Sequence, residues 1–202
     1  MRASRVRAAV ALGVPAVTWA AAHFSSPEVR AWRPGAGDRR IVAGLGVRQY
    51  GSGDDLVVLL SGLASSERFW GAAYDVLGHG ARVVAIDPIG FGASMHSVAQ
   101  QHLIDADAHV DGVLAVLRQL GLEAVPAVIV GHSMGASLAL RVAARHAPIR
   151  AVVAFDAPLY LTHEEADDRV RHMGWFEALL AQGPFAERVC QWMCDNRAAA
   201  RG

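Results

Sequence analysis

Short apolar runs that alternate with helical patterns restrict the fold of this chain more than any other feature. Four of these runs are rich in Val and Ile and lie at 56–62, 82–88, 127–131 and 151–156. Continuous apolar runs of this length are typical of strands that are buried on both faces of a sheet. The alternation of strand and helix therefore predicts an α/β fold, with a mostly parallel sheet and helices on both of its faces.

The rest of the pattern supplies helices and one more sheet segment. Helical spacing is present in three segments, at 65–77, 102–122 and 134–148. Ser65 or Ser66 is the expected N-cap of the first helix, and Gly121 is the expected end of the second. Residues 41–50 predict one strand or a tight pair of strands. After Pro158 the sequence has no further Val/Ile run and reads as charged, amphipathic helices.

Length and composition favour a single core domain, because 202 residues of which 53% are hydrophobic can bury one sizeable core. We expect a basic and apolar N-terminal segment with a linker at 1–37, an α/β core at 38–157 and a helical segment at 158–202. The formal net charge of zero gives no electrostatic case for nucleic acid as a partner. The chain contains no lysine, which excludes mechanisms that need a lysine Schiff base.

The N-terminus admits more than one interpretation. Arg2, Arg5 and Arg7 precede an apolar run at 8–22, as in an export signal or a membrane-associating segment. Residues 1–22 could equally form a helix or tail on the domain surface, or follow from a start codon placed too early. The localisation is therefore left open between cytoplasmic and exported or membrane-associated.

One motif in the sequence predicts a catalytic site. Gly131-His132-Ser133-Met134-Gly135 fits G-x-S-x-G, with an expected strand before it and an expected helix after it. Glycine is needed on either side because side chains there would collide with neighbouring backbone. The turn directs the Ser133 hydroxyl outward at the carboxyl edge of the sheet, where open α/β sheets bind ligands. The N–H groups of Met134 and of Leu63, in the turn after strand 56–60, are the expected oxyanion donors.

With two other segments, this motif resembles the α/β-hydrolase fold family, specifically its serine-hydrolase branch with a helical lid. The other matches are the turn at 61–63 and D-x-x-G-x-G-x-S at 87–94, and the resemblance covers about residues 40–160. It implies hydrolysis of an ester or another acyl bond of a small molecule, without a cofactor or metal. A serine at the elbow argues against the dehalogenase and epoxide-hydrolase branches. The family usually has His-Gly where this chain has Ser61-Gly62, which removes a side chain that braces the loop.

The resemblance also implies a catalytic base at a position that no residue of this sequence matches. In the family the acid and then the histidine follow the serine, on loops after later strands. We therefore expect a chain that is incomplete at its C-terminus, inactive or nearly so, and poorly soluble. The strand at 151–156 would then be an exposed edge through which copies self-associate. Residues 158–202 would be the start of the lid.

Several other side chains are candidates for the acid and the base. Asp156 ends the strand after the elbow helix, where some family members carry the acid. His132 adjoins Ser133, but side chains of successive residues at a tight turn diverge, so a structural role is expected. His163 and His172 follow in the segment that resembles a lid. A short enzyme that uses Asp156 with one of these two histidines is one alternative, and a non-catalytic or partner-dependent protein is another.

One group of residues in the sequence has the spacing of metal ligands on a helix. His102, Asp105 and His109 would share one face of the helix at 102–122. A solvated polar face opposite the apolar stripe explains the same spacing. We therefore predict neither a metal nor a cofactor.

Overall fold

The computed structural model describes residues 32–63, 65–96, 105–146, 148–160 and 162–172. The chain divides into two compact units, Met1–Pro34 and Gly35–Gly202, and everything below concerns the second. The predictions for residues 1–22 and for the C-terminal part from 173 onward lie outside the described residues. Among the described residues, no helix combines the length and apolarity that crossing a membrane would need.

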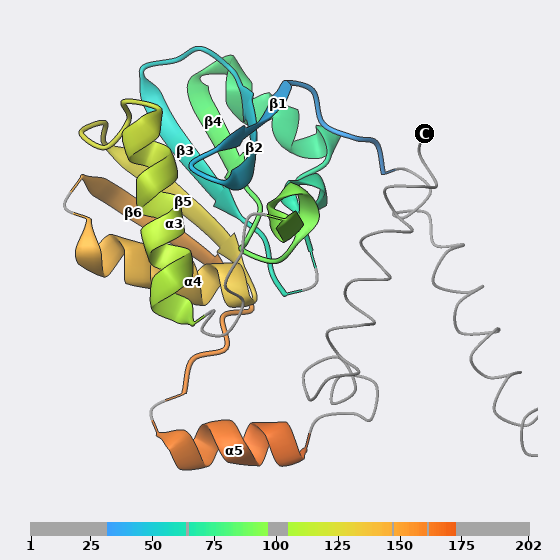
Figure 1. Cartoon of the computed structure of the whole chain (residues 1–202), viewed down its shortest axis with the longest axis vertical. Coiled ribbons are helices and arrows are strands. Elements are labelled where there is room, and N and C mark those ends of the chain that lie inside the picture. The colour runs from blue at the N-terminus through green and yellow to red at the C-terminus, as the bar shows by residue number, and fades with distance from the viewer. Residues whose placement is uncertain (1–31, 64, 97–104, 147, 161, 173–202) are drawn as a thin grey trace, which may run out of the picture. The chain divides into compact units, whose positions relative to one another are not determined.

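A six-stranded sheet forms the centre of this unit (Figure 1). Its strands are β1 (Asp38–Val42), β2 (Leu45–Tyr50), β3 (Asp55–Leu60), β4 (Ala81–Ile86), β5 (Ala127–His132) and β6 (Ile149–Phe155). They lie in the order β1-β2-β4-β3-β5-β6. The four strands from β4 to β6 in this order pair in parallel, whereas β1 and β2 pair antiparallel. The predicted mostly parallel sheet is confirmed.

The first two strands form the tight pair that was one of the two expectations for residues 41–50. Val42 pairs with Leu45, and Ala43 and Gly44 both have positive φ in the connecting turn. A two-residue connection with positive φ at both positions matches the twist of a β-hairpin.

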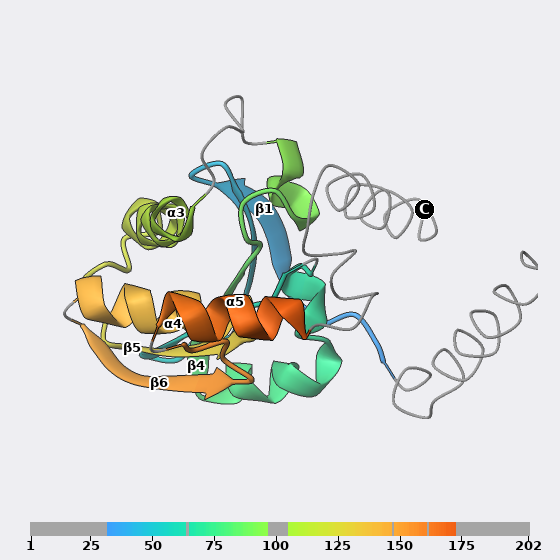
Figure 2. The ribbon, with the colours of Figure 1, turned by 90° about the horizontal axis from the view of Figure 1, so that it is seen from below.

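Two α-helices cover one face of the sheet (Figure 2). Helix α3 (Ala106–Gln119) begins with Asp105 as its N-cap, and Gly121 follows its end with φ +67°, as predicted. Helix α4 (Met134–Arg145) follows the Ser133 turn directly. Their apolar sides pack on alternate residues of the strands, such as Val58 and Leu60, in the larger of the two core clusters.

The opposite face is covered differently from the prediction. In place of one α-helix over 65–77, the structure has two 3₁₀ segments, η1 (Glu67–Phe69) and η2 (Ala72–His79). Ser66 is the N-cap of η1, as one of the two expectations had it. Gly71 has extended backbone between the segments and so prevents a continuous helix. Trp70, beside it, packs with Leu59 and Val83 in the second core cluster.

Strand β6 departs from the expectation of burial on both faces. It is an edge strand among the described residues, and Val153 and Phe155 are 40% and 49% exposed. Ile149 and Val152 do pack against the larger core cluster. Burial on both faces is therefore wrong for β6, because η1 and η2 do not extend over its outer face. Two further elements are described, η3 (Gly92–His96) and α5 (His163–Arg171).

Candidate active site

Ser133 occupies a strained turn between β5 and α4. Its backbone has φ 52° and ψ −123°, a conformation that residues other than glycine rarely adopt. The turn is held by two backbone hydrogen bonds: the Ser133 N–H donates to the carbonyl of Phe155 (2.8 Å), and the N–H of Ala136 donates to the Ser133 carbonyl (2.9 Å). The Ser133 side chain is half-buried and makes no hydrogen bond with the described residues. Its hydroxyl is thus free for another partner.

The two glycines of the motif are required by close backbone approach, as predicted. A Cβ on Gly131 would lie 2.3 Å from the carbonyl oxygen of Gly135. A Cβ on Gly135 would lie 2.3 Å and 2.5 Å from the carbonyl oxygens of Leu60 and Ser61. The start of α4 therefore presses directly against the end of β3.

This contact brings the turn at 61–63 beside Ser133. A Cβ on Gly62 would lie only 3.1 Å from the Ser133 Cβ. The N–H groups of Leu63 and Met134 donate no hydrogen bond within the described part of the chain. Met134 also starts α4, where the helix dipole favours negative charge. Two backbone amides without a described acceptor therefore belong to the Ser133 turn and to the turn that contacts it.

His132, which precedes Ser133, forms a loose pair with Asp156. The His132 ring stacks on Phe69, with centroids 4.7 Å apart, and its Nε2 lies 3.8 Å from Asp156 Oδ2. That separation is too long for a hydrogen bond, and the Asp156 side chain is 88% exposed. His172, in contrast, bonds within its own segment through Nδ1 to the carbonyl of Asp168. No histidine of the described residues is hydrogen-bonded to Ser133.

The structure differs from the expectation that Asp105 and His109 share one face of a helix with His102. Asp105 lies outside the helix and caps it by accepting a hydrogen bond from the N–H of Ala108 (2.8 Å). His109 Nδ1 accepts a hydrogen bond from the N–H of Ile89 (3.2 Å), and burial lowers the pKa of this ring. His102 lies outside the described residues. Among the residues that are described, no group of three His, Cys, Asp or Glu side chains could hold a metal ion.

Asp87, at the end of β4, links two loops near the site. Its Oδ2 accepts a hydrogen bond from the N–H of Ala93 (2.7 Å), within its own loop. Its Oδ1 accepts one from the N–H of Glu67 (2.5 Å), in the segment that follows the 61–63 turn. Burial raises the pKa of Asp87 to about 6. The link to Glu67 is a feature that sequence reasoning missed.

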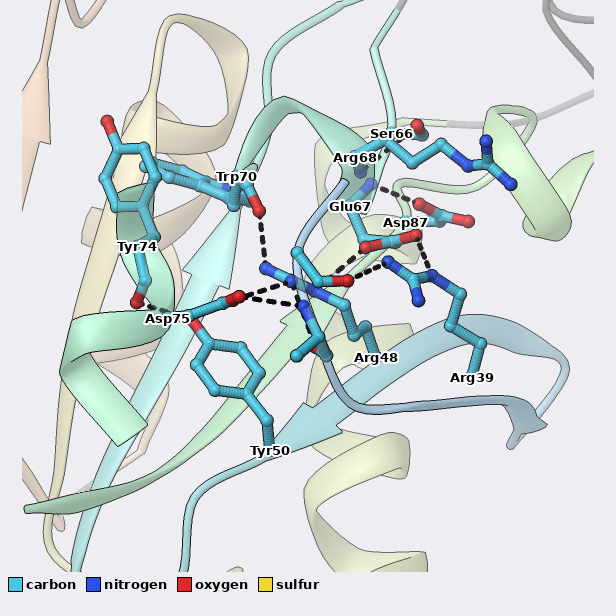
Figure 3. A network of polar contacts seen from close by, with 12 residues as sticks. Arg39, Arg48, Tyr50, Ser66, Glu67, Arg68, Trp70, Tyr74, Asp75 and Asp87 are labelled. Carbon is cyan, nitrogen blue, oxygen red and sulfur yellow. Dashed lines mark hydrogen bonds and ion pairs between the residues drawn. The ribbon is translucent and has the colours of Figure 1, made fainter. Parts of the chain in front are cut away.

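Glu67 also belongs to a buried polar cluster with Arg39, Arg48 and Asp75 (Figure 3). No sequence signal marks this cluster, because an arginine in a strand is usually solvent-facing and the partners are far apart in the chain.

Comparisons with known proteins agree with this architecture. Residues 55–202 match the family described as alpha/beta hydrolase fold. The chain is 32% identical over 123 residues to N-formylmaleamate deformylase of Pseudomonas putida, an alignment that covers 58% of this chain and 44% of the deformylase. The chain therefore spans less than half the length of that relative.

Solved structures show the same fold. E-2-(acetamidomethylene)succinate hydrolase is 27% identical with a TM-score of 0.57, over 67% of this chain and 50% of that one. An epoxide hydrolase from an endophytic Streptomyces is 25% identical with a TM-score of 0.57, over 77% of this chain and 49% of that one. From the sheet order, the Ser133 turn and the match over 55–202, the chain belongs to the α/β-hydrolase fold family.

Proposed function

We propose that this protein is a serine hydrolase that cleaves an ester or another acyl bond of a small molecule, with Ser133 as its nucleophile. One observation carries the proposal: the Ser133 hydroxyl sits on a strained turn, in contact with a second turn whose amide hydrogens are unused. Strain of this kind persists only where the surrounding structure holds it, and it clusters at functional sites. The similar proteins with hydrolase names support the same class of reaction.

The chemistry would proceed through an acyl-enzyme. The Ser133 Oγ forms a bond to the carbonyl carbon while its proton passes to a base, and the carbonyl electron pair moves to oxygen. The N–H groups of Leu63 and Met134 would hold this oxyanion. When the carbonyl re-forms, the leaving group departs and the acyl group stays on Ser133 until water removes it.

No base for Ser133 is identified among the described residues. None of the described histidines is hydrogen-bonded to Ser133, and a neutral serine is a weak nucleophile without one. Asp156 is our candidate for the acid, although its only described partner is the loosely paired His132. We therefore propose that the 202-residue chain turns over substrate slowly or not at all unless a base is supplied.

The names of two similar proteins bear on the substrate. N-formylmaleamate deformylase and E-2-(acetamidomethylene)succinate hydrolase are both named for small acids that carry an acyl group on nitrogen. We include N-acyl bonds beside esters in the proposed substrate range for this reason.

Rescue by an added base tests the proposal. With p-nitrophenyl acetate, the chain alone should release p-nitrophenolate no faster than the Ser133→Ala variant does. Added imidazole can act as the base, so the wild type should then exceed Ser133→Ala under the same imidazole concentration, with a rate that saturates. Equal rates for the two proteins at all imidazole concentrations would refute a reactive serine at position 133.

A second candidate is a non-catalytic or partner-dependent protein, which the open edge at β6 favours. We propose that copies of the chain self-associate through this edge, because exposed apolar edge strands pair with other chains. Membrane association through residues 1–22 stays a prediction from the sequence. Cosedimentation with phospholipid vesicles, compared with a chain that lacks these residues, would test it.

A further inference from the structure

The turn that would hold the oxyanion is not braced by its own first side chain. Ser61 is fully buried, and its hydroxyl has no hydrogen-bond partner among the described residues. A buried hydroxyl without a partner stabilises nothing. The position of the neighbouring Leu63 N–H must therefore be set by other contacts.

The residues from 61 to 69 contact the Ser133 turn at two places. At one end, Gly62 lies against Ser133. At the other end, the Phe69 ring stacks on His132, which directly precedes Ser133, at an interplanar angle of 18°. Leu63 lies between these two contacts in sequence, so a shift of either contact would move Leu63 relative to Ser133.

In sequence, Glu67 lies between Gly62 and Phe69. Figure 3 shows the polar contacts that anchor Glu67. Its N–H donates to Asp87, its carbonyl accepts from the N–H of Trp70 (3.1 Å), and its Oε1 accepts from Arg39 Nε (2.9 Å). The side chain is 7% exposed. A carboxylate this deeply buried is stable only when it is paired, so its position is tightly specified.

Arg48 of β2 extends the anchor into the sheet. Its Nε lies 3.0 Å from Glu67 Oε2, an ion pair in which neither atom forms an aligned hydrogen bond. The same guanidinium donates to the carbonyl of Trp70 (2.5 Å) and to Asp75 Oδ1 (3.2 Å). Its side chain is 0% exposed and lies over the Tyr50 ring at 4.6 Å. Arg48 therefore fixes the end of η1 that carries Phe69 and Trp70.

We propose that Glu67, held by Arg48 and Arg39, is a positioning residue for the oxyanion donor Leu63, and that the buried ion pair does the bracing that Ser61 cannot. This inference rests on the proposed role of Leu63 and Ser133. Glu67 does not contact the reacting atoms. It acts by holding residues 61–69 against the Ser133 turn, where displacement of a donor by about 1 Å is enough to slow a reaction by about a hundredfold.

The test uses two measurements on the same variants. Glu67→Gln keeps the shape of the side chain and the backbone hydrogen bond to Asp87. Its amide nitrogen cannot accept a hydrogen bond, so either Arg39 or Arg48 loses its acceptor oxygen. Hydrogen–deuterium exchange should become faster in peptides that cover 61–66 and stay unchanged in β5. In the imidazole-supported assay, the maximal acylation rate of Ser133 should fall about tenfold or more, while the half-saturating ester concentration stays the same.

Two further variants keep the result interpretable. Arg39→Met removes only the partly exposed arm of the cluster, so it should fold and show a smaller effect of the same kind. Val116→Ala, in the buried face of α3 and away from the cluster, is the control for a general loss of stability. It should leave both the exchange at 61–66 and the maximal rate close to wild type.

The outcomes separate the two proposals. If the wild type shows no acylation that depends on Ser133, the proposed function fails, and the exchange data alone decide whether Glu67 positions the turn. If the wild type reacts but Glu67→Gln matches Val116→Ala in exchange and in rate, the positioning role is refuted. Faster exchange at 61–66 with an unchanged rate would also refute it, because the turn would then not need the brace for catalysis.

Discussion

At the scale of single residues, Gly135 is a position in the Ser133 turn where a larger side chain has no room. Gly135→Ala would place a methyl group 2.3 Å from the Leu60 carbonyl oxygen, a contact that neither backbone can relieve easily. We expect a loss of about 1–3 kcal/mol or more in the free energy of unfolding. Gly80→Ala is the matched control, because nothing lies within 4 Å of a Cβ there and its φ is −130°. Urea unfolding of both variants measures the difference, and equal losses would contradict the close approach.

Asp87 makes stability depend on pH in an unusual direction. Its pKa rises from 3.8 to about 6 on folding, chiefly because burial disfavours the charged carboxylate. Between these values the folded state binds more protons than the unfolded state, so this group's contribution to stability falls as pH rises through the window. Above pH 6 the accumulated penalty is about 3 kcal/mol.

Asp87→Asn tests this linkage. The Asn amide nitrogen cannot accept one of the two hydrogen bonds that the Asp87 oxygens accept, so the variant should be less stable than wild type at pH 4. Its deficit should shrink by about 2 kcal/mol between pH 4 and pH 7, because it carries no buried charge. Urea unfolding across pH 4–7 measures this, with Asp54→Asn as the exposed control. A deficit that stays constant or grows with pH would contradict the raised pKa.

At the scale of elements, β6 sets the association behaviour that we propose. Val153→Lys puts a charge on the exposed face of the edge strand, which disfavours pairing with another copy. Sedimentation velocity at several concentrations should show wild-type mass rising with concentration and the variant staying closer to a monomer. Val76→Lys, at an exposed position on η2, is the control. Equal behaviour of the two variants would rule out association through β6.

The strands and the 3₁₀ segments differ in how far sequence could predict them. Strands β3, β4 and β5 could be predicted because strands that are buried on both faces have a continuous run of apolar residues. The same kind of run in β6 led to a wrong prediction of burial on both faces. Apolar residues show that a strand can be buried, but not whether other elements cover it. The helix expected at 65–77 became two segments because Gly71 and the bond from Arg48 to the Trp70 carbonyl set the backbone there.

Only the part of the candidate site that is formed by residues close together in sequence could be predicted. Glycines that flank a serine between a strand and a helix report close backbone approach, and the structure has that approach at Gly131 and Gly135. The brace from Arg48 to Glu67 joins segments that are distant in the chain, and neither residue stands out in its local pattern. Contacts of this kind depend on the sheet order, which brings β2 beside β4.

At the scale of the whole molecule, the sheet brings the ends of β3 and β5 together. The turn at 61–63 and the strained Ser133 turn therefore lie in contact although they are far apart in sequence. If Ser133 is the nucleophile that we propose, its reactivity depends on the assembled sheet and not on the G-x-S-x-G motif alone.

Peptide mapping by mass spectrometry after reaction with p-nitrophenyl acetate and imidazole tests this claim most directly. The account predicts one acetyl group on Ser133, absent from the Ser133→Ala protein and from protein unfolded in urea. Acetylation spread over other serines and tyrosines with Ser133 unmodified, or the same modification of Ser133 in the unfolded chain, would contradict it.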